Sequence, residues 1–207
     1  MTLRTKKLAL TALMAALTAV LTLASVPLPG GGYYNFGDVA IFIAAAALGP
    51  VAGAFAGGLG GALGDLILGY TFYAPFTLVI KALEGLIAGL LFKAFKSAFI
   101  KEGDTVKKVV FSAVSNVVGG LMMAAGYFLA EGLLLAEGKW QGGLVNLPWN
   151  ILQGALSAVV APVILFACRL ENVIKKTLNY PRKKSDGGNN DGAEETKDER
   201  ENTNVKG

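Results

Sequence analysis

Six apolar stretches, each nearly free of charge, constrain this chain more than any other feature. Most approach the roughly 20 residues that an α-helix needs to cross a lipid bilayer. The second is the shortest, and we expect its helix to begin before Val39, near Asn35. The sequence therefore predicts an all-α integral membrane protein with six transmembrane helices. The stretches are Leu8–Val26, Val39–Leu48, Val51–Leu68, Phe76–Phe92, Val109–Leu129 and Ile151–Ala167.

Lysine and arginine residues predict the orientation of these helices. Basic clusters precede the first stretch, lie between the fourth and the fifth, and follow the sixth. Cytoplasmic loops of membrane proteins are enriched in Lys and Arg, so all three clusters are expected in the cytoplasm. With six spans, both the N and the C terminus are then cytoplasmic. The clusters are Arg4, Lys6 and Lys7; Lys93, Lys96, Lys101, Lys107 and Lys108; and Arg169, Lys175 and Lys176.

Composition divides the chain into two parts. Residues 1–178 contain all the apolar stretches and form the predicted six-helix membrane domain. Residues 179–207 are mostly polar, with mixed charge and many Gly and Asn residues, and cannot bury enough apolar surface to fold, so we expect a disordered cytoplasmic tail. The net charge of +4 comes from the residues beside the membrane. It therefore indicates contact with lipid headgroups and not with nucleic acid.

Missing residue types exclude several classes of function. The chain has no histidine and a single cysteine, Cys168, so an intramolecular disulfide, histidine-based proton transfer and most zinc sites are excluded. No nucleotide-binding or hydrolase motif is present. We therefore expect no catalytic residue, no metal and no cofactor, and the protein should not be an enzyme. If it drives uptake, the energy must come from a partner or from an ion gradient.

Lys81 and Glu84 are the only charged residues between Ala74 and Phe92. At a spacing of three they share one helix face. Removing an ammonium and a carboxylate from water costs several kcal/mol each unless they are paired or hydrated. Such a pair inside a membrane marks a functional site by default, and an ion pair that only fixes helix packing is the alternative. We expect a binding site here.

Other polar residues fall at a similar depth. At 1.5 Å per residue, Asp65, Lys81 and Gln153 lie within roughly 10 Å of the outer ends of their predicted helices. Asn116 and Asn150 extend the set, although each could serve only to bond neighbouring helices. The cytoplasmic half is almost purely apolar, whereas a channel needs polar lining throughout. The pattern favours a pocket that opens to the outside.

Aromatic residues are concentrated in the predicted outer loops. Tyr33 and Tyr34 follow a run of three glycines between the first two helices, and Tyr73 lies in the next outer loop. Glycine permits large backbone movements, and flat rings can stack on a planar ligand. The sequence thus predicts a flexible aromatic lid. For Trp140 and Trp149, which flank the third outer loop, a belt at the membrane surface is an equal alternative.

Small residues recur at helical spacing on three helices. Ala12/Ala16 and Ala15/Ala19 in the first helix would let another helix approach closely. For this helix, internal packing and binding of a partner remain equal alternatives. The third and fourth helices carry similar glycine pairs, and for the third we favour packing within the chain. These pairs are Gly53/Gly57/Gly61, Gly60/Gly64 and Gly85/Gly89.

Taken together, five segments resemble the substrate-binding S component of energy-coupling factor (ECF) vitamin transporters. The likeness extends over about Leu8–Lys176, and Lys81-Ala-Leu-Glu-Gly85 is most similar to the riboflavin-type branch. That branch also includes transporters for pyridoxine and for the hydroxymethylpyrimidine precursor of thiamine. The other four segments are the alanine-rich first helix, Asn35-Phe-Gly-Asp-Val39, Ala47-Leu-Gly-Pro-Val-Ala-Gly53 and Gly61-Ala-Leu-Gly-Asp65.

This resemblance implies a six-helix protein of the bacterial plasma membrane that captures a vitamin at the extracellular face. A mobile loop between the first two helices closes over the ligand. Ala12, Ala15, Ala16 and Ala19 match the motif that docks on a transmembrane scaffold subunit, which is coupled to two cytoplasmic ATPases. We expect Lys81, Glu84, Asp65, Asn116, Asn150 and Gln153 to contact the ligand, with Tyr33, Tyr34 and Tyr73 against its ring. A stand-alone proton- or sodium-coupled transporter, with Asp65 and Glu84 as ion sites, is the alternative.

Overall fold

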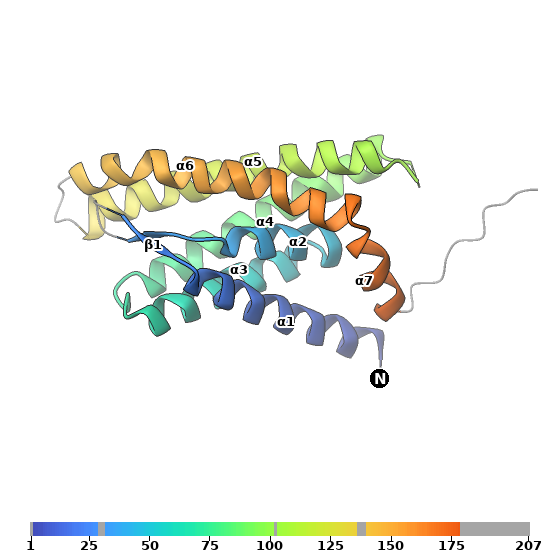
Figure 1. The fold of residues 1–207 in the computed structure, drawn as a ribbon, viewed down its shortest axis with the longest axis horizontal. Coiled ribbons are helices and arrows are strands. Elements are labelled where there is room, and N and C mark those ends of the chain that lie inside the picture. Colours follow the sequence, from blue (N-terminus) through green and yellow to red (C-terminus); the bar gives the residue numbers. More distant parts are fainter. Residues whose placement is uncertain (1, 29–31, 102, 136–139, 179–207) are drawn as a thin grey trace, which may run out of the picture.

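The computed structural model describes residues 2–28, 32–101, 103–135 and 140–178, which form an elongated helical bundle (Figure 1). The predicted tail, residues 179–207, lies outside the described residues. Short α2 is enclosed by α1, α3, α4 and α6, and nine of its twelve residues are buried. The elements are α1 Leu3–Leu23, β1 Val26–Pro27, β2 Tyr33–Tyr34, α2 Gly37–Leu48, α3 Pro50–Leu68, α4 Ala74–Phe99, α5 Thr105–Ala130, α6 Gln141–Pro162 and α7 Leu170–Leu178.

The structure is helical, as expected for an all-α membrane protein. Among the described residues, four helices are long and apolar enough to span a bilayer: α1, α3, α5 with its continuation to Leu133, and α6 with its continuation to Ala167. Helix α2 has 12 residues, or roughly 18 Å, which is short of the roughly 30 Å of a bilayer core. Helix α4 has 26 residues but includes Lys81, Glu84, Lys93 and Lys96.

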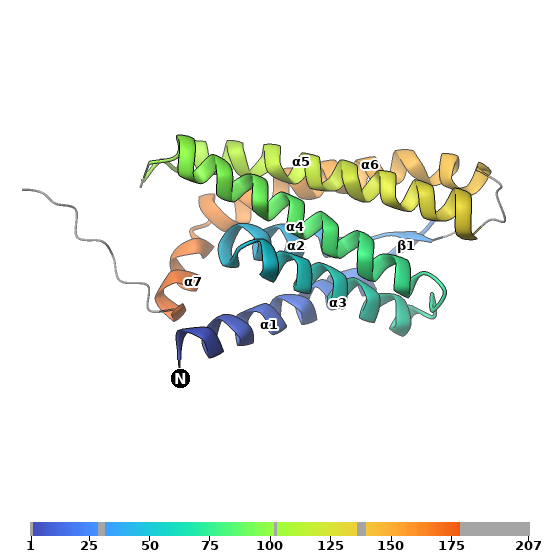
Figure 2. The same ribbon diagram turned by 180° about the vertical axis from the view of Figure 1, so that it is seen from behind.

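The helix ends and connections fall into two groups. The start of α1, the α4–α5 connection and α7 lie at one end of the bundle (Figures 1 and 2). Strands β1 and β2, the α3–α4 connection, the end of α5 and the start of α6 lie at the other end. The three basic clusters of the sequence therefore share one end of the molecule.

Two helix boundaries differ from the expected ones. Helix α1 ends at Leu23 and not at Val26, because Val26 and Pro27 pair with Tyr34 and Tyr33 in a two-stranded hairpin. Helix α6 begins at Gln141, before Pro148, where the sequence predicts its start, and well before the apolar stretch that begins at Ile151.

A proline inside a helix frees one carbonyl and usually marks a boundary, which explains the wrong expectation for α6. Trp149 consequently lies within α6 and not beside a loop, and Asn146 lies in the first two turns of this helix. Gln153 lies 12 residues from the start of this helix, or roughly 18 Å, deeper than expected.

Glycines bring α3 against its neighbours. A Cβ on Gly60 would lie 2.5 Å from the Ala15 carbonyl oxygen and 2.6 Å from Thr18 Cβ, so α1 and α3 are in backbone contact there. On the other side of α3, a Cβ on Gly57 would collide with the Lys81 carbonyl of α4. The expectation that the α3 glycines serve internal packing is confirmed.

Helix α7 is held against the basic end of the bundle. Its Ile174 and Leu178 are buried in the main apolar core. Glu171 accepts a hydrogen bond from Lys108 of α5 at 2.9 Å and pairs with Lys175 of its own helix. Partial burial raises the pKa of Glu171, but the hydrogen bonds from the two lysines outweigh it and hold the pKa below the ordinary glutamate value.

Replacing Gly60 with valine should destabilise the bundle, because the added atoms collide with the backbone of α1. We expect a loss of about 1–3 kcal/mol, the usual cost of overpacking. The control is Leu59→Val on the exposed side of the same helix, which should change stability little. Thermal unfolding in detergent measures both, and equal melting temperatures would contradict the close contact.

Acid should release α7. Because the pKa of folded Glu171 is depressed, its pairing stabilises the docked helix above the ordinary glutamate pKa and is lost as pH falls through the folded value. Hydrogen exchange of 170–178, corrected for the intrinsic rate, should therefore lose protection on acidification. Glu171→Gln should show low protection at neutral pH and little further change. Equal protection of both proteins at neutral pH would argue against this role.

Candidate ligand-binding site

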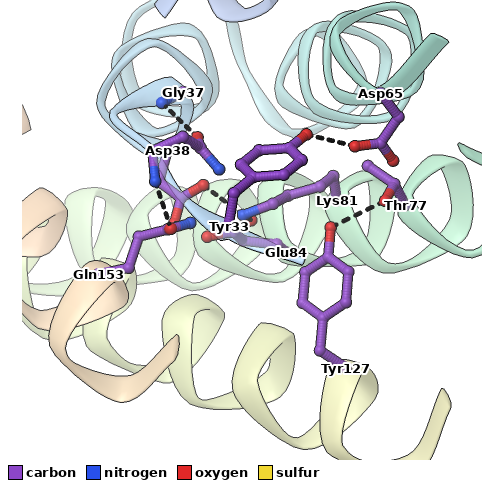
Figure 3. Close-up of polar contacts among 10 residues, drawn as sticks. Tyr33, Gly37, Asp38, Asp65, Thr77, Lys81, Glu84, Tyr127 and Gln153 are labelled. Atoms are coloured by element: carbon purple, nitrogen blue, oxygen red, sulfur yellow. Dashed lines mark hydrogen bonds and ion pairs between the residues drawn. The ribbon is translucent and has the colours of Figure 1, made fainter. Parts of the chain in front are cut away.

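A buried lysine between two carboxylates lies inside the bundle. Lys81 of α4 forms ion pairs with Asp38 of α2 and, at 3.0 Å, with Glu84 one turn along its own helix (Figure 3). Lys81 is 3% exposed, and both carboxylates are fully buried. The expected Lys81–Glu84 pair therefore exists, but it belongs to a cluster of three charges that joins two helices.

Asp38 is the residue that sequence reasoning missed in this cluster. It lies in the first turn of α2, where the helix dipole favours a negative charge. Two carboxylates share one ammonium here, and burying an ion without a partner costs several kcal/mol. One signal in the sequence could have revealed this role. Asp38 lies at the start of an apolar stretch, and a charged residue at that depth needs a partner of opposite charge.

Gln153 connects this cluster to the segment before α2. Its Nε2 donates to Asp38 at 2.9 Å, and its Oε1 accepts from the backbone N–H of Asn35, also at 2.9 Å. The Asn35 side chain in turn accepts from the N–H of Gly37 at 2.8 Å. The end of the hairpin connection is thereby fixed to α6.

Tyr33 lies over the cluster and reaches α3. Its hydroxyl donates to Asp65, and its ring packs against Tyr70 with centroids 4.9 Å apart (Figure 3). On the opposite side, Tyr127 of α5 donates to Thr77 at 3.0 Å, and its ring centroid lies 5.8 Å from Lys81 Nζ. Aromatic side chains from the hairpin and from α5 thus enclose the polar cluster.

These side chains surround a cavity of about 30 Å³, near the end of the bundle that carries the hairpin. This volume suits a water molecule, whereas pockets for small organic ligands usually measure about 300–1,000 Å³. The structure therefore shows the site closed, with Tyr33 as part of its wall. The lining residues are Thr22, Leu28, Gly32, Tyr33, Asn35, Gly61, Asp65, Tyr73, Thr77, Lys81, Tyr127, Glu131, Asn150 and Gln153.

Six of the nine expected ligand contacts line this cavity: Lys81, Asp65, Asn150, Gln153, Tyr33 and Tyr73. The other three do not. Glu84 pairs with Lys81 away from the lining, and Tyr34 packs edge-on against Phe36 with centroids 5.5 Å apart. Asn116 is buried in α5, and its Nδ2 donates to none of the residues that the structure describes.

Glu131 was also missed, and it is the least expected member of the lining. It begins a π-helical segment, Glu131–Leu135, that continues α5. It is 4% exposed, and its Oε1 accepts from Asn146 of α6 at 3.1 Å. In the sequence it follows an apolar stretch and resembles a boundary residue, so only the continued helix reveals that it is buried.

The alanines of α1 separate into two faces. Ala15 and Ala19 are buried against the bundle, on the same side as Thr18 and Thr22. Ala12 and Ala16 are exposed on the outer surface of the helix. Of the four expected docking residues, two therefore remain accessible to another helix.

Comparison with known proteins agrees with this architecture. The model of a family described as "ECF-type riboflavin transporter, S component" matches residues 2–170. The thiamine precursor transporter HmpT of Lactococcus lactis is 32% identical over 163 residues, which cover 77% of this chain and 87% of HmpT. An uncharacterized protein from the gap 3′ region of Pyrococcus woesei is 36% identical over 146 residues, or 70% of this chain and 88% of that protein. The family description and the name of HmpT indicate a transporter component and not an enzyme.

Removing the lysine should destabilise the protein strongly. Lys81→Met leaves Asp38 and Glu84 buried without their cation, and breaking such a pair costs about 3–5 kcal/mol. Adding Asp38→Asn and Glu84→Gln to this variant should restore much of the loss, because the remaining groups are then neutral. Thermal unfolding in detergent measures both variants. If Lys81→Met alone were as stable as the parent, the cluster would not be what holds the bundle together.

Proposed function

Because the chain belongs to the ECF-type riboflavin transporter S component family, we propose that it is the substrate-binding subunit of an ECF-type importer. It captures a vitamin or vitamin precursor of the riboflavin, pyridoxine or hydroxymethylpyrimidine class. Partner subunits then drive uptake with ATP. The closed cavity supports this proposal most directly, since it combines aromatic side chains with a few convergent polar groups.

In this proposal the cavity faces the extracellular side. The three basic clusters lie at the opposite end of the bundle and would face the cytoplasm, together with both termini. The protein would cross the bacterial plasma membrane six times. Helix α2 is enclosed by neighbouring helices and α4 pairs its two central charges internally, so both could lie within the membrane although neither meets the simple criteria for a span.

The hairpin serves as the lid in this mechanism. For a vitamin to enter, the Tyr33 side chain must leave the Asp65 carboxylate, because the cavity cannot otherwise hold a heteroaromatic ring. Hydrogen bonds link the Asn35 backbone to Gln153 and Gln153 to Asp38, and Asp38 pairs with Lys81, so the hairpin connection is joined to the charged cluster. Closure of the lid and ordering of the charged cluster are therefore coupled.

Partner docking is assigned to the exposed face of α1. Ala12 and Ala16 lie there among large apolar side chains, of which Leu13 is 58% and Val20 60% exposed. Small residues between larger ones permit close approach of a second helix in a membrane. This face would contact the transmembrane scaffold subunit, which carries two ATPases. Ala15 and Ala19 would support docking only by holding α1 on α3.

Ligand identification tests the proposed function. The protein is purified without added vitamin and denatured, and the released molecules are identified by absorbance and mass spectrometry. A stoichiometric flavin, pyridoxine or aminopyrimidine is expected, together with a thermal shift when that compound is added back.

The ion-coupled alternative predicts a different result. The isolated protein would then accumulate substrate in vesicles under a proton or sodium gradient, without ATPase partners. Such uptake, or an empty protein that no vitamin stabilises, would contradict the binding-subunit proposal.

A further inference from the structure

The cavity is acidic beyond what its single lysine can balance. Asp38 and Glu84 both pair with Lys81. Asp65 and Glu131, which line the cavity directly, form no ion pair with any residue that the structure describes. They are 2% and 4% exposed, so water does not compensate them from the surface. Four buried carboxylates therefore share one ammonium.

Each of the two lining carboxylates has one oxygen in use and one without a partner. Asp65 Oδ1 accepts from Tyr33, and Glu131 Oε1 accepts from Asn146 at 3.1 Å. Asp65 Oδ2 and Glu131 Oε2 are buried and accept no hydrogen bond within the described part of the chain, although the Thr77 hydroxyl also interacts with the Asp65 carboxylate. A buried acceptor that receives no hydrogen bond costs free energy, and the cost is larger when the group is charged. What both oxygens require is a donor.

The two carboxylates approach the cavity from different elements. Asp65 projects from α3 to the Tyr33 hydroxyl, whereas Glu131, beyond the end of α5, lies beside Gly32. A Cβ on Gly32 would lie 3.7 Å from Glu131 Oε1. Because Gly32 and Tyr33 are consecutive, a molecule that replaces this part of the hairpin would lie near both carboxylates.

From this arrangement we propose that the pocket takes a cationic or amino-substituted heteroaromatic whose N–H groups donate to Asp65 and Glu131. This inference rests on the proposed function and narrows its substrate class. Charge-assisted hydrogen bonds of this kind are about twice as strong as neutral ones. They also give selectivity, because an analogue without the donor leaves the carboxylates unpaired.

The same residues disfavour phosphate esters and flavins. A phosphate ester would need a free cation, but Lys81 is already held by Asp38 and Glu84. A flavin ring carries a single N–H and no exocyclic amino group, so the ring cannot donate to both Asp65 and Glu131. The pocket is thus selective through its acidic groups and not only through its shape.

Calorimetric titration of the intact protein in lipid nanodiscs tests the proposal with three probes. They are the aminopyrimidine precursor of thiamine, its analogue with oxygen in place of the exocyclic amino group, and riboflavin. The aminopyrimidine should bind at least about tenfold more tightly than either competitor, the effect of one charge-assisted hydrogen bond.

Glu131→Gln should weaken aminopyrimidine binding by about tenfold or more, because it replaces an acceptor oxygen by a donor amide. The apo protein should remain folded with an equal or higher melting temperature, since the variant removes a buried charge. Glu171→Gln at the opposite end of the bundle is the matched control and should bind like the parent. If Glu131→Gln fails to fold, Asp65→Asn provides the second test, with the same expected loss.

Three results would overturn the proposal. Riboflavin or the oxygen analogue could bind more tightly than the aminopyrimidine, in which case the protein remains a vitamin-binding subunit but its selectivity is not cationic. Aminopyrimidine affinity within about twofold of the parent in both Glu131→Gln and Asp65→Asn would remove the carboxylates from recognition. Absence of binding or thermal shift with all three probes would overturn this inference, and the same result with pyridoxine as a fourth probe would reject the proposed function itself.

Discussion

The burial of one ammonium between two carboxylates is the interaction on which the rest of this structure depends. Lys81 can remain charged inside the bundle only because Asp38 comes from another helix to share it with Glu84. That requirement fixes the position of α2 against α4. Gln153 then connects Asp38 to the Asn35 backbone, so the same cluster determines where the hairpin connection enters the bundle.

Close helix contact is the condition that makes this cluster possible. Helix α3 lies near enough to α4 for Gly57 to touch the Lys81 carbonyl, and near enough to α1 for Gly60 to touch that of Ala15. In a membrane, where burial of apolar groups does not drive helices together, such contact supplies the attraction. The glycines of α3 therefore act on the site indirectly, since they determine the distances between the helices that carry its charges.

The sequence was informative where a signal lay within one helix and less so where it depended on two. Lys81 and Glu84 stand three residues apart in an apolar stretch, so their pairing followed from helical spacing alone. Asp38 is 43 residues away from Lys81, and its role depends on packing that no local pattern encodes. Glu131 was hidden for another reason, because a π-helical extension carries it past the apparent end of α5. Pro148 similarly concealed the first two turns of α6.

The position of Tyr33 has a kinetic consequence. A cavity of about 30 Å³ cannot admit a ring, so binding requires molecules in which this side chain has already withdrawn or is displaced. The apparent dissociation constant is then the intrinsic one divided by the open fraction, and an open fraction of roughly 1% would weaken the apparent affinity about 100-fold. The association rate would level off at high ligand concentration, at the rate of hairpin opening. Substitutions far from the ligand that loosen the hairpin could therefore tighten binding without adding a contact.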